Sequence, residues 1–200
     1  MPRHFKLIKK IIFFVCLIPL LRLIWLGFHD DLTANPIEFI ERSTGYWALF
    51  FLLVTLSFTP LRLMTKIFWP VQLRRMLGLY MFFYAVLHIV AYLLIDYAFD
   101  WQEILKDVIK HPYVLVGLSA FLLSIPLAFT STNAMIKKLG KRWKTLHQLV
   151  YLIAILGVVH FWWLVKKDIR EPLLFAVILL MLLGVRVFFK LRNQSTYKKL

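Results

Sequence analysis

The sequence predicts an all-α integral membrane protein, a six-transmembrane-helix bundle with both termini on the cytoplasmic side. First, 61% of its 200 residues are hydrophobic and the mean hydropathy is +0.74, which is more apolar than soluble domains of this length usually are. Second, the apolar residues fall in long blocks, and a helix needs about 20 such residues to cross a bilayer. Third, basic and acidic residues occupy different connections between the blocks.

Six blocks are long enough to span a membrane: 8–28, 46–63, 76–97, 112–130, 146–165 and 172–190. They use most of the chain, so we expect one domain over residues 1–200. No small-residue cleavage site follows the first block, which favours a retained helix over a signal peptide. Pro19 and Pro126 fall inside blocks, where they are expected to kink the helices.

Segment 98–111, between the third and fourth blocks, is amphipathic. Its apolar residues recur at helical spacing, at Trp101, Ile104, Leu105, Val108 and Ile109. This pattern predicts a short helix lying on the outer membrane surface. The same face could also serve as a docking ledge for a partner.

The net charge of +15 is distributed unevenly along the chain. Basic residues precede the first block and gather around the second and fourth connections, the latter two at Arg62, Lys66, Arg74, Arg75, Lys137, Lys138, Lys141, Arg142 and Lys144. Acidic residues gather in the first and third connections, at Asp30, Asp31, Glu38, Glu41, Asp96, Asp100, Glu103 and Asp107. The positive-inside rule then places both termini and the two basic connections in the cytoplasm. The basic residues are better explained by membrane orientation and contact with anionic lipid than by nucleic-acid binding.

Two histidines lie where hydrocarbon would surround them. His88 is in the third block and His160 in the fifth, and an imidazole is costly there unless something binds it. Both blocks run from inside to outside. With a rise of about 1.5 Å per residue, His88 lies roughly 20 Å beyond Arg74, and His160 roughly 20 Å beyond His147. The sequence therefore predicts an outer level of His88 and His160 and an inner level of Arg74 and His147.

Two facing imidazoles without acidic or thiol neighbours suit a haem b with two axial histidines. Zinc prefers four ligands, proton relays use carboxylates, and the single cysteine, Cys16, excludes a multi-cysteine metal site. The alternative is that each histidine only hydrogen-bonds a neighbouring helix. His147 and His160 are 13 residues apart, which places them about 140° apart on an ideal helix, so a shared face requires tilt or a bend near Gly157.

Three segments strongly resemble a known family: GYWALFFLLVTLSFTPLR (45–62), LRRMLGLYMFFYAVLHIVAYLL (73–94) and AFTSTNAMIKKLGKRWKTLHQLVYLIAILGVVHFWW (128–163). The family is MsrQ, the haem-binding membrane subunits of bacterial methionine sulfoxide reductase systems. It belongs to the ferric-reductase-like transmembrane superfamily, in which two helices typically carry two histidine ligands each. The phrase FTST-x4-KKLGKRW-x2-LH is the most distinctive part of the match. Here the inner position of the third helix is Arg74 instead of histidine.

The resemblance implies a multi-pass protein of the bacterial inner membrane with one or two haems b, and FMN as a further cofactor. The implied metal ligands are His88, His160 and His147, with Arg74 as a cofactor-binding residue. The resemblance also implies electron delivery to a periplasmic molybdenum-cofactor reductase, MsrP, which repairs oxidised methionine.

The chain contains no G-x-G-x-x-G and no P-loop, so its electrons are expected from the quinone pool or from a separate cytoplasmic flavin reductase. We expect an electron-transfer subunit with no catalytic residue for substrate reduction. The alternatives are a self-contained ferric reductase, and a non-redox small transporter or scaffold.

Overall fold

The computed structural model describes residues 3–165 and 168–197. Within that part of the chain six helical stretches are long and apolar enough to cross a membrane: Phe5–Phe28, Pro36–Thr65, Trp69–Asp96, Pro112–Phe129, Lys141–Leu164 and Arg170–Arg192. Each corresponds to one of the six predicted blocks. The prediction of an all-α membrane protein with six spans is therefore confirmed, and the cytoplasmic placement of the termini stays a prediction.

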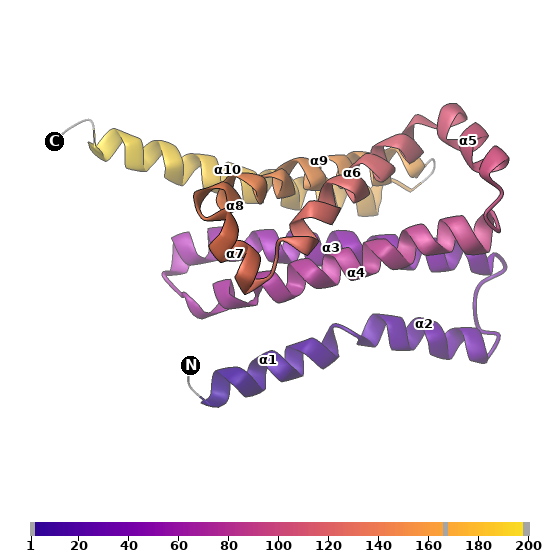
Figure 1. Cartoon of the computed structure of the whole chain (residues 1–200), viewed down its shortest axis with the longest axis horizontal. Helices are drawn as coiled ribbons and strands as arrows, with labels where there is room; N and C mark the ends of the chain where they lie inside the picture. Colours follow the sequence, from indigo (N-terminus) through magenta and orange to yellow (C-terminus); the bar gives the residue numbers. More distant parts are fainter. Residues whose placement is uncertain (1–2, 166–167, 198–200) are drawn as a thin grey trace.

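Two helical hairpins form the centre of the bundle (Figure 1). In the first, α3 (Pro36–Thr65) packs against α4 (Arg74–Val90). In the second, α6 (Pro112–Phe129) packs against α9 (Leu149–Leu164). The hairpins meet where α4 contacts α6 and α3 contacts α9, and α10 (Arg170–Tyr197) lies against α3 and α9. This arrangement brings the third and fifth spans to the middle of the molecule.

The remaining helices flank this centre. Helices α1 (Arg3–Val15) and α2 (Ile18–Phe28) run along one side, and α2 contacts α3. At one end of the bundle is α5 (Trp101–Lys110), and at the other are α7 (Asn133–Leu139) and α8 (Lys141–Leu146) (Figure 1). Two short irregular turns adjoin α4: the 3-10 helix η1 (Trp69–Leu73) before it and the π-helix η2 (Ala91–Asp96) after it.

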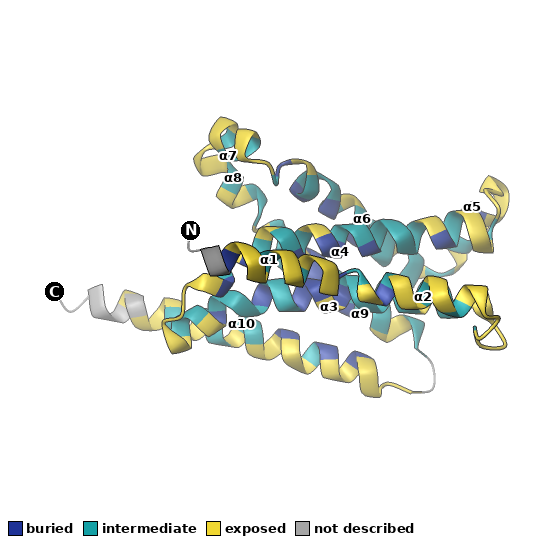
Figure 2. Ribbon diagram, turned by 90° about the horizontal axis from the view of Figure 1, so that it is seen from below, coloured by how far each residue is buried: buried dark blue, intermediate teal, exposed yellow. Residues whose placement is uncertain are grey.

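Burial follows this arrangement (Figure 2). The most buried side chains lie on the central helices and include Leu52, Leu56, Tyr84 and Ala154. Large apolar side chains on α1, α2 and α10 are instead exposed, among them Phe14, Trp25, Leu180 and Phe188. Exposed apolar surface on this scale is expected of helices whose outer faces meet lipid.

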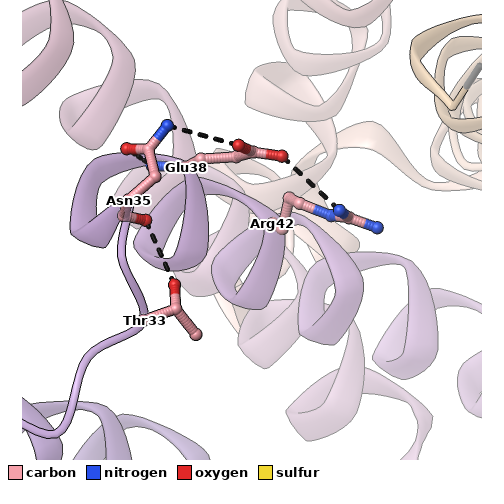
Figure 3. Close-up of polar contacts among 4 residues, drawn as sticks. All are labelled: Thr33, Asn35, Glu38 and Arg42. Atoms are coloured by element: carbon pink, nitrogen blue, oxygen red, sulfur yellow. Dashed lines mark hydrogen bonds and ion pairs between the residues drawn. The ribbon is translucent and has the colours of Figure 1, made fainter.

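Helix α3 begins at Pro36, ten residues before the predicted block that starts at 46. Figure 3 shows the reason. The Glu38 backbone N–H donates to Asn35 Oδ1 over 3.3 Å, and the Asn35 amide donates to the Glu38 carboxylate over 3.2 Å. Arg42 closes an ion pair with Glu38 at 3.5 Å. An asparagine cap, proline at the first helical position and an acidic first turn together stabilise a helix start.

The first span is broken at Cys16 and Leu17, between α1 and α2. Pro19 has no N–H to donate, and its ring clashes with the carbonyl four residues earlier. The Tyr84 hydroxyl of α4 enters the gap: the Leu20 N–H donates to it over 3.2 Å, and it donates to the Cys16 carbonyl over 2.8 Å. The helix is therefore interrupted beside Pro19, in line with the predicted effect of this proline. Helix α6 continues past Pro126 to Phe129, and a kink at Pro126 stays a prediction.

Replacing Tyr84 by phenylalanine leaves the Leu20 N–H and the Cys16 carbonyl without a partner inside a membrane span. We expect a loss of about 1–3 kcal/mol in the free energy of unfolding, since an unsatisfied buried polar group costs that much. The measurement is denaturant-induced unfolding in mixed micelles. Tyr46→Phe is the control, because Tyr46 packs its ring on Trp47 and Phe175. Equal stability of the two variants would contradict this role for Tyr84.

The amphipathic segment forms α5, which confirms the predicted short helix. It is fastened through Asp107, whose carboxylate accepts from Tyr92 at 2.8 Å and contacts His111 Nδ1 at 2.8 Å. Ile104 is buried, while Trp101 and Ile109 are exposed. Burial raises the pKa of Asp107, but hydrogen bonds from Tyr92, His111 and Tyr97 outweigh it and hold the pKa below its ordinary value.

This lowered pKa predicts a pH-dependent attachment of α5. A depressed folded-state pKa means that the network stabilises the fold above the unfolded pKa of about 3.9 and loses this contribution as pH falls through the folded value. Amide hydrogen exchange in α5, corrected for the intrinsic rate, should therefore rise below about pH 4. In Asp107→Asn the exchange should be faster at neutral pH and lack this step. An identical pH profile in both proteins would exclude Asp107 as the cause.

Candidate functional site

The structure brings His88 of α4 and His160 of α9 together. Their ring centroids are 6.2 Å apart and their planes are inclined by 72°. Both side chains are half-buried, inside spans that come from different hairpins. His88 and His160, which were predicted to lie at the same depth in the membrane, therefore lie side by side.

Each ring is held by the backbone of the preceding helix in its own hairpin. His88 Nδ1 lies 2.9 Å from the Glu41 carbonyl oxygen, and His160 Nδ1 lies 2.7 Å from the Tyr113 carbonyl oxygen. A carbonyl can only accept, so Nδ1 carries the proton and donates in both rings. The Nε2 atom of each neutral ring keeps its lone pair, which is the form of histidine that binds a metal.

A glycine faces each ring. A Cβ atom on Gly45 would lie 3.2 Å from His88 Nδ1, and one on Gly117 would lie 2.7 Å from His160 Nδ1. Real Cβ atoms essentially never approach other atoms as closely as 2.7 Å. Only the absence of a side chain at Gly117 therefore lets the imidazole reach the backbone of α6.

The two half-sites have the same spacing. In each, 47 residues separate the histidine from its carbonyl partner. The glycine follows that carbonyl by four residues, as Gly45 follows Glu41 and Gly117 follows Tyr113. Sequence reasoning missed both glycines, although the shared distance of 43 residues from glycine to histidine (88 − 45 and 160 − 117) is a signal that could have found them.

The distance between the rings fits one metal ion held between them. A metal–imidazole bond is about 2 Å and the nitrogen lies about 1.1 Å from the ring centre, so two such ligands place their centroids about 6 Å apart. The observed 6.2 Å agrees with this. Within the described ranges no group of three or more His, Cys, Asp or Glu side chains is placed to hold a metal, so the pair is a two-nitrogen donor set. This donor set suits a haem, which needs only axial ligands from the protein.

The alternative interpretation was that each histidine only hydrogen-bonds a neighbouring helix, and the structure contains such bonds. Each ring does hydrogen-bond a carbonyl of a neighbouring helix, as a purely structural histidine would. That bond uses only Nδ1, however. It orients the ring and leaves the second nitrogen to a ligand, so helix pinning and metal binding are compatible here.

The residues of the predicted inner level take separate partners. Arg74 donates to the Thr59 hydroxyl of α3. His147 Nε2 lies 3.0 Å from Thr130 Oγ1, and the Trp143 indole stacks on its ring with centroids 3.9 Å apart. No hydrogen bond or ring contact joins Arg74 to His147 among the described residues. Their joint role in cofactor binding stays a prediction.

The fifth span is interrupted near its start. Helix α8 ends at Leu146 and α9 starts at Leu149, so the break falls at His147 and Gln148. Helix α9 runs unbroken from Leu149 to Leu164, so the interruption does not fall at Gly157, and a tilt or bend there stays a prediction. Gly157 instead packs closely on α3, where its Cβ would lie 3.3 Å from Leu49 Cδ1. Because the helix is interrupted at His147, His147 and His160 do not lie on one continuous helix. The angle of about 140° expected between them on an ideal helix therefore does not apply.

The sequence profile described as ferric reductase like transmembrane component matches residues 41–158, which include His88, Gly45 and Gly117 and end two residues before His160. The chain is 51% identical over 197 residues to the protein-methionine-sulfoxide reductase heme-binding subunit MsrQ of Herminiimonas arsenicoxydans, covering 97% of this chain and 90% of that protein. For the protein of the same name from Ralstonia nicotianae the identity is 45% over 195 residues, covering 96% and 90%.

A third relative of that name, from Xanthomonas euvesicatoria, is 51% identical over 173 residues, which cover 86% of this chain and 79% of that protein. These matches extend over all six spans in the first two cases and over most of the chain in the third. The chain therefore belongs to the ferric-reductase-like transmembrane family and, within it, to the MsrQ group of haem-binding subunits.

Proposed function

We propose that this protein carries electrons across the bacterial inner membrane through haem b held between His88 and His160. The observation that carries the proposal is the 6.2 Å separation of two rings whose Nδ1 atoms are both engaged by backbone carbonyls. Its relatives are named heme-binding subunits of a methionine sulfoxide reductase, which supports the same conclusion. The family match supports an electron-transfer role.

The chain's own residues would fix the orientation of the two ligands. Glu41 and Tyr113 hold the Nδ1 protons, so each ring presents Nε2 in a fixed tautomer. Gly45 and Gly117 provide the space that this orientation needs. A bound haem supplies a one-electron ferric–ferrous couple, while the protein sets its position and surroundings.

The proposed route of the electron rests on the distribution of basic residues and on the names of the related proteins. The basic connections would face the cytoplasm, where the quinone pool or a cytoplasmic flavin reductase is the donor. The acceptor would be a periplasmic molybdoprotein of the MsrP type, because the relatives are named subunits of a methionine sulfoxide reductase. Arg74 and His147 would mark the inner level, at which FMN or a second haem binds.

Proteoliposomes test this proposal. The purified protein should show a Soret band and the split α/β bands of a six-coordinate haem. With dithionite trapped inside the vesicles and a periplasmic molybdoprotein outside, methionine sulfoxide should be reduced only when the protein is present. A folded sample without a Soret band ends the proposal. Reduction of external ferric chelate in place of the molybdoprotein would favour a self-contained ferric reductase.

A further inference from the structure

Two arginines converge on a single turn of α3, and neither of them contacts the histidine pair in the hydrogen bonds of the described residues. Arg74 of α4 donates to the Thr59 hydroxyl, and Arg186 of α10 donates to the Leu56 carbonyl three residues earlier. Arg186 also donates to the Tyr151 hydroxyl over 2.9 Å, with its guanidinium carbon 5.2 Å from that ring's centroid. Both arginines belong to candidate membrane spans.

Among the residues that the structure describes, these two positive charges have no acidic partner. All ten Asp and Glu residues of the chain lie in segments 30–41, 96–107 and 168–171, which are the connections and span ends on the α5 side of the bundle. The polar partners of Arg74 and Arg186 described above are neutral, and the two guanidinium groups repel each other. Two like charges held together in a low-dielectric region are costly unless a counter-charge joins them.

Hydrogen-bonding capacity is also unused at this place. Within residues 3–165 and 168–197, Arg74 Nε and Arg186 Nε are buried without a hydrogen-bond partner, and so is the Thr55 hydroxyl on the same stretch of α3. Unsatisfied buried donors are rare in native proteins and call for an explanation. These three unused polar groups and the two positive charges are suited to bind an oxyanion. Guanidinium groups recognise phosphate and carboxylate through several N–H donors.

We infer that Arg74, Arg186 and Thr55 form a binding site for the phosphate or carboxylate group of a small anionic molecule, seated where α3, α4 and α10 meet. The inference deepens the proposed function and rests on it for location, because the site lies at the inner level where electrons would arrive. Its residues are distinct from the histidine pair. The anionic group has three chemically suitable sources: the phosphate of a flavin mononucleotide, the propionates of an inner haem and the phosphate of an anionic lipid.

The test uses the full-length protein in phosphatidylcholine nanodiscs and three binding measurements. FMN and riboflavin, which differ by the phosphate, are titrated by fluorescence quenching. Haem per protein is measured by the pyridine haemochrome assay. Retained phosphatidylglycerol is counted by native mass spectrometry. We expect one of these ligands to be held by the wild type and to bind at least about tenfold more weakly in Arg186→Gln. If the ligand is flavin, riboflavin should bind at least about tenfold more weakly than FMN.

Control variants separate charge from folding. Arg22→Gln removes an exposed positive charge from α2 and should bind like the wild type. Arg186→Lys should recover part of the affinity, and Thr55→Val should weaken binding without changing the charge. Equal retention of all three ligands by the wild type and Arg186→Gln overturns the inference. The Soret band of the His88–His160 haem is read in the same samples, so its absence would count against the proposed function and not against the anion site.

Discussion

Replacing His160 by alanine is expected to abolish the haem of the ring pair. The variant loses one of two axial nitrogens, and the remaining ring of His88 cannot hold a six-coordinate haem by itself. His88→Ala should have the same effect, since both rings contribute one Nε2 from equivalent positions. The expected result is an affinity for this haem that is lower by at least about tenfold, which corresponds to about 1.4 kcal/mol of binding free energy. Soret absorbance per protein measures it.

Arg74→Ala is the matched comparison for these variants. Arg74 lies on the same helix as His88, but its guanidinium bonds Thr59 and does not contact the histidine pair. The Soret band of the six-coordinate haem should therefore remain in Arg74→Ala. Equal loss of haem in all three variants would contradict the separation into two levels. Retention of the full band in His160→Ala would remove the histidine ligation itself.

Gly117→Ala should disrupt the same haem without altering either ligand. The new Cβ would lie 2.7 Å from His160 Nδ1, so the ring must leave its hydrogen bond with the Tyr113 carbonyl. We expect haem affinity to fall by at least about tenfold, because the misplaced ring no longer presents Nε2 to the metal. Gly45→Ala should be milder, since its Cβ would lie 3.2 Å from the His88 ring and a small shift relieves the contact.

Gly184→Ala is the control for the glycine variants, because a Cβ at Gly184 meets nothing within 4 Å. It should leave haem content and stability unchanged. Electron paramagnetic resonance of the ferric protein is the second readout, since it distinguishes an altered axial ligand from simple loss of protein. If Gly117→Ala bound haem with an unchanged spectrum, the glycine would have no part in placing the ring.

The six spans could be predicted because apolar length is a local property of the sequence. The common level of His88 and His160 could be predicted for a similar reason: the rise per residue of a helix is fixed. The early start of α3 was also readable, since Asn35, Pro36 and Glu38 form a recognisable helix start. The prediction missed it because hydropathy alone set the boundary at 46.

Other features depend on contacts between distant segments. The opposition of Gly117 and His160 becomes visible only when α6 lies against α9. The gap in the first span is filled by Tyr84, which is 68 residues from Cys16. Arg186 lies near the end of its block, where a basic residue is typical of a membrane anchor, and only the fold shows it beside Arg74.

The repeated 47-residue relation between histidine and carbonyl has a consequence for cofactor capture. Each imidazole is oriented inside one hairpin, by a bond that forms as that hairpin folds and that needs nothing from the other. The rotational entropy of both rings is therefore lost during folding and not when a porphyrin arrives, which leaves more of the ligation energy available as affinity. A preorganised apoprotein of this kind can complete its membrane insertion first and receive its prosthetic group afterwards.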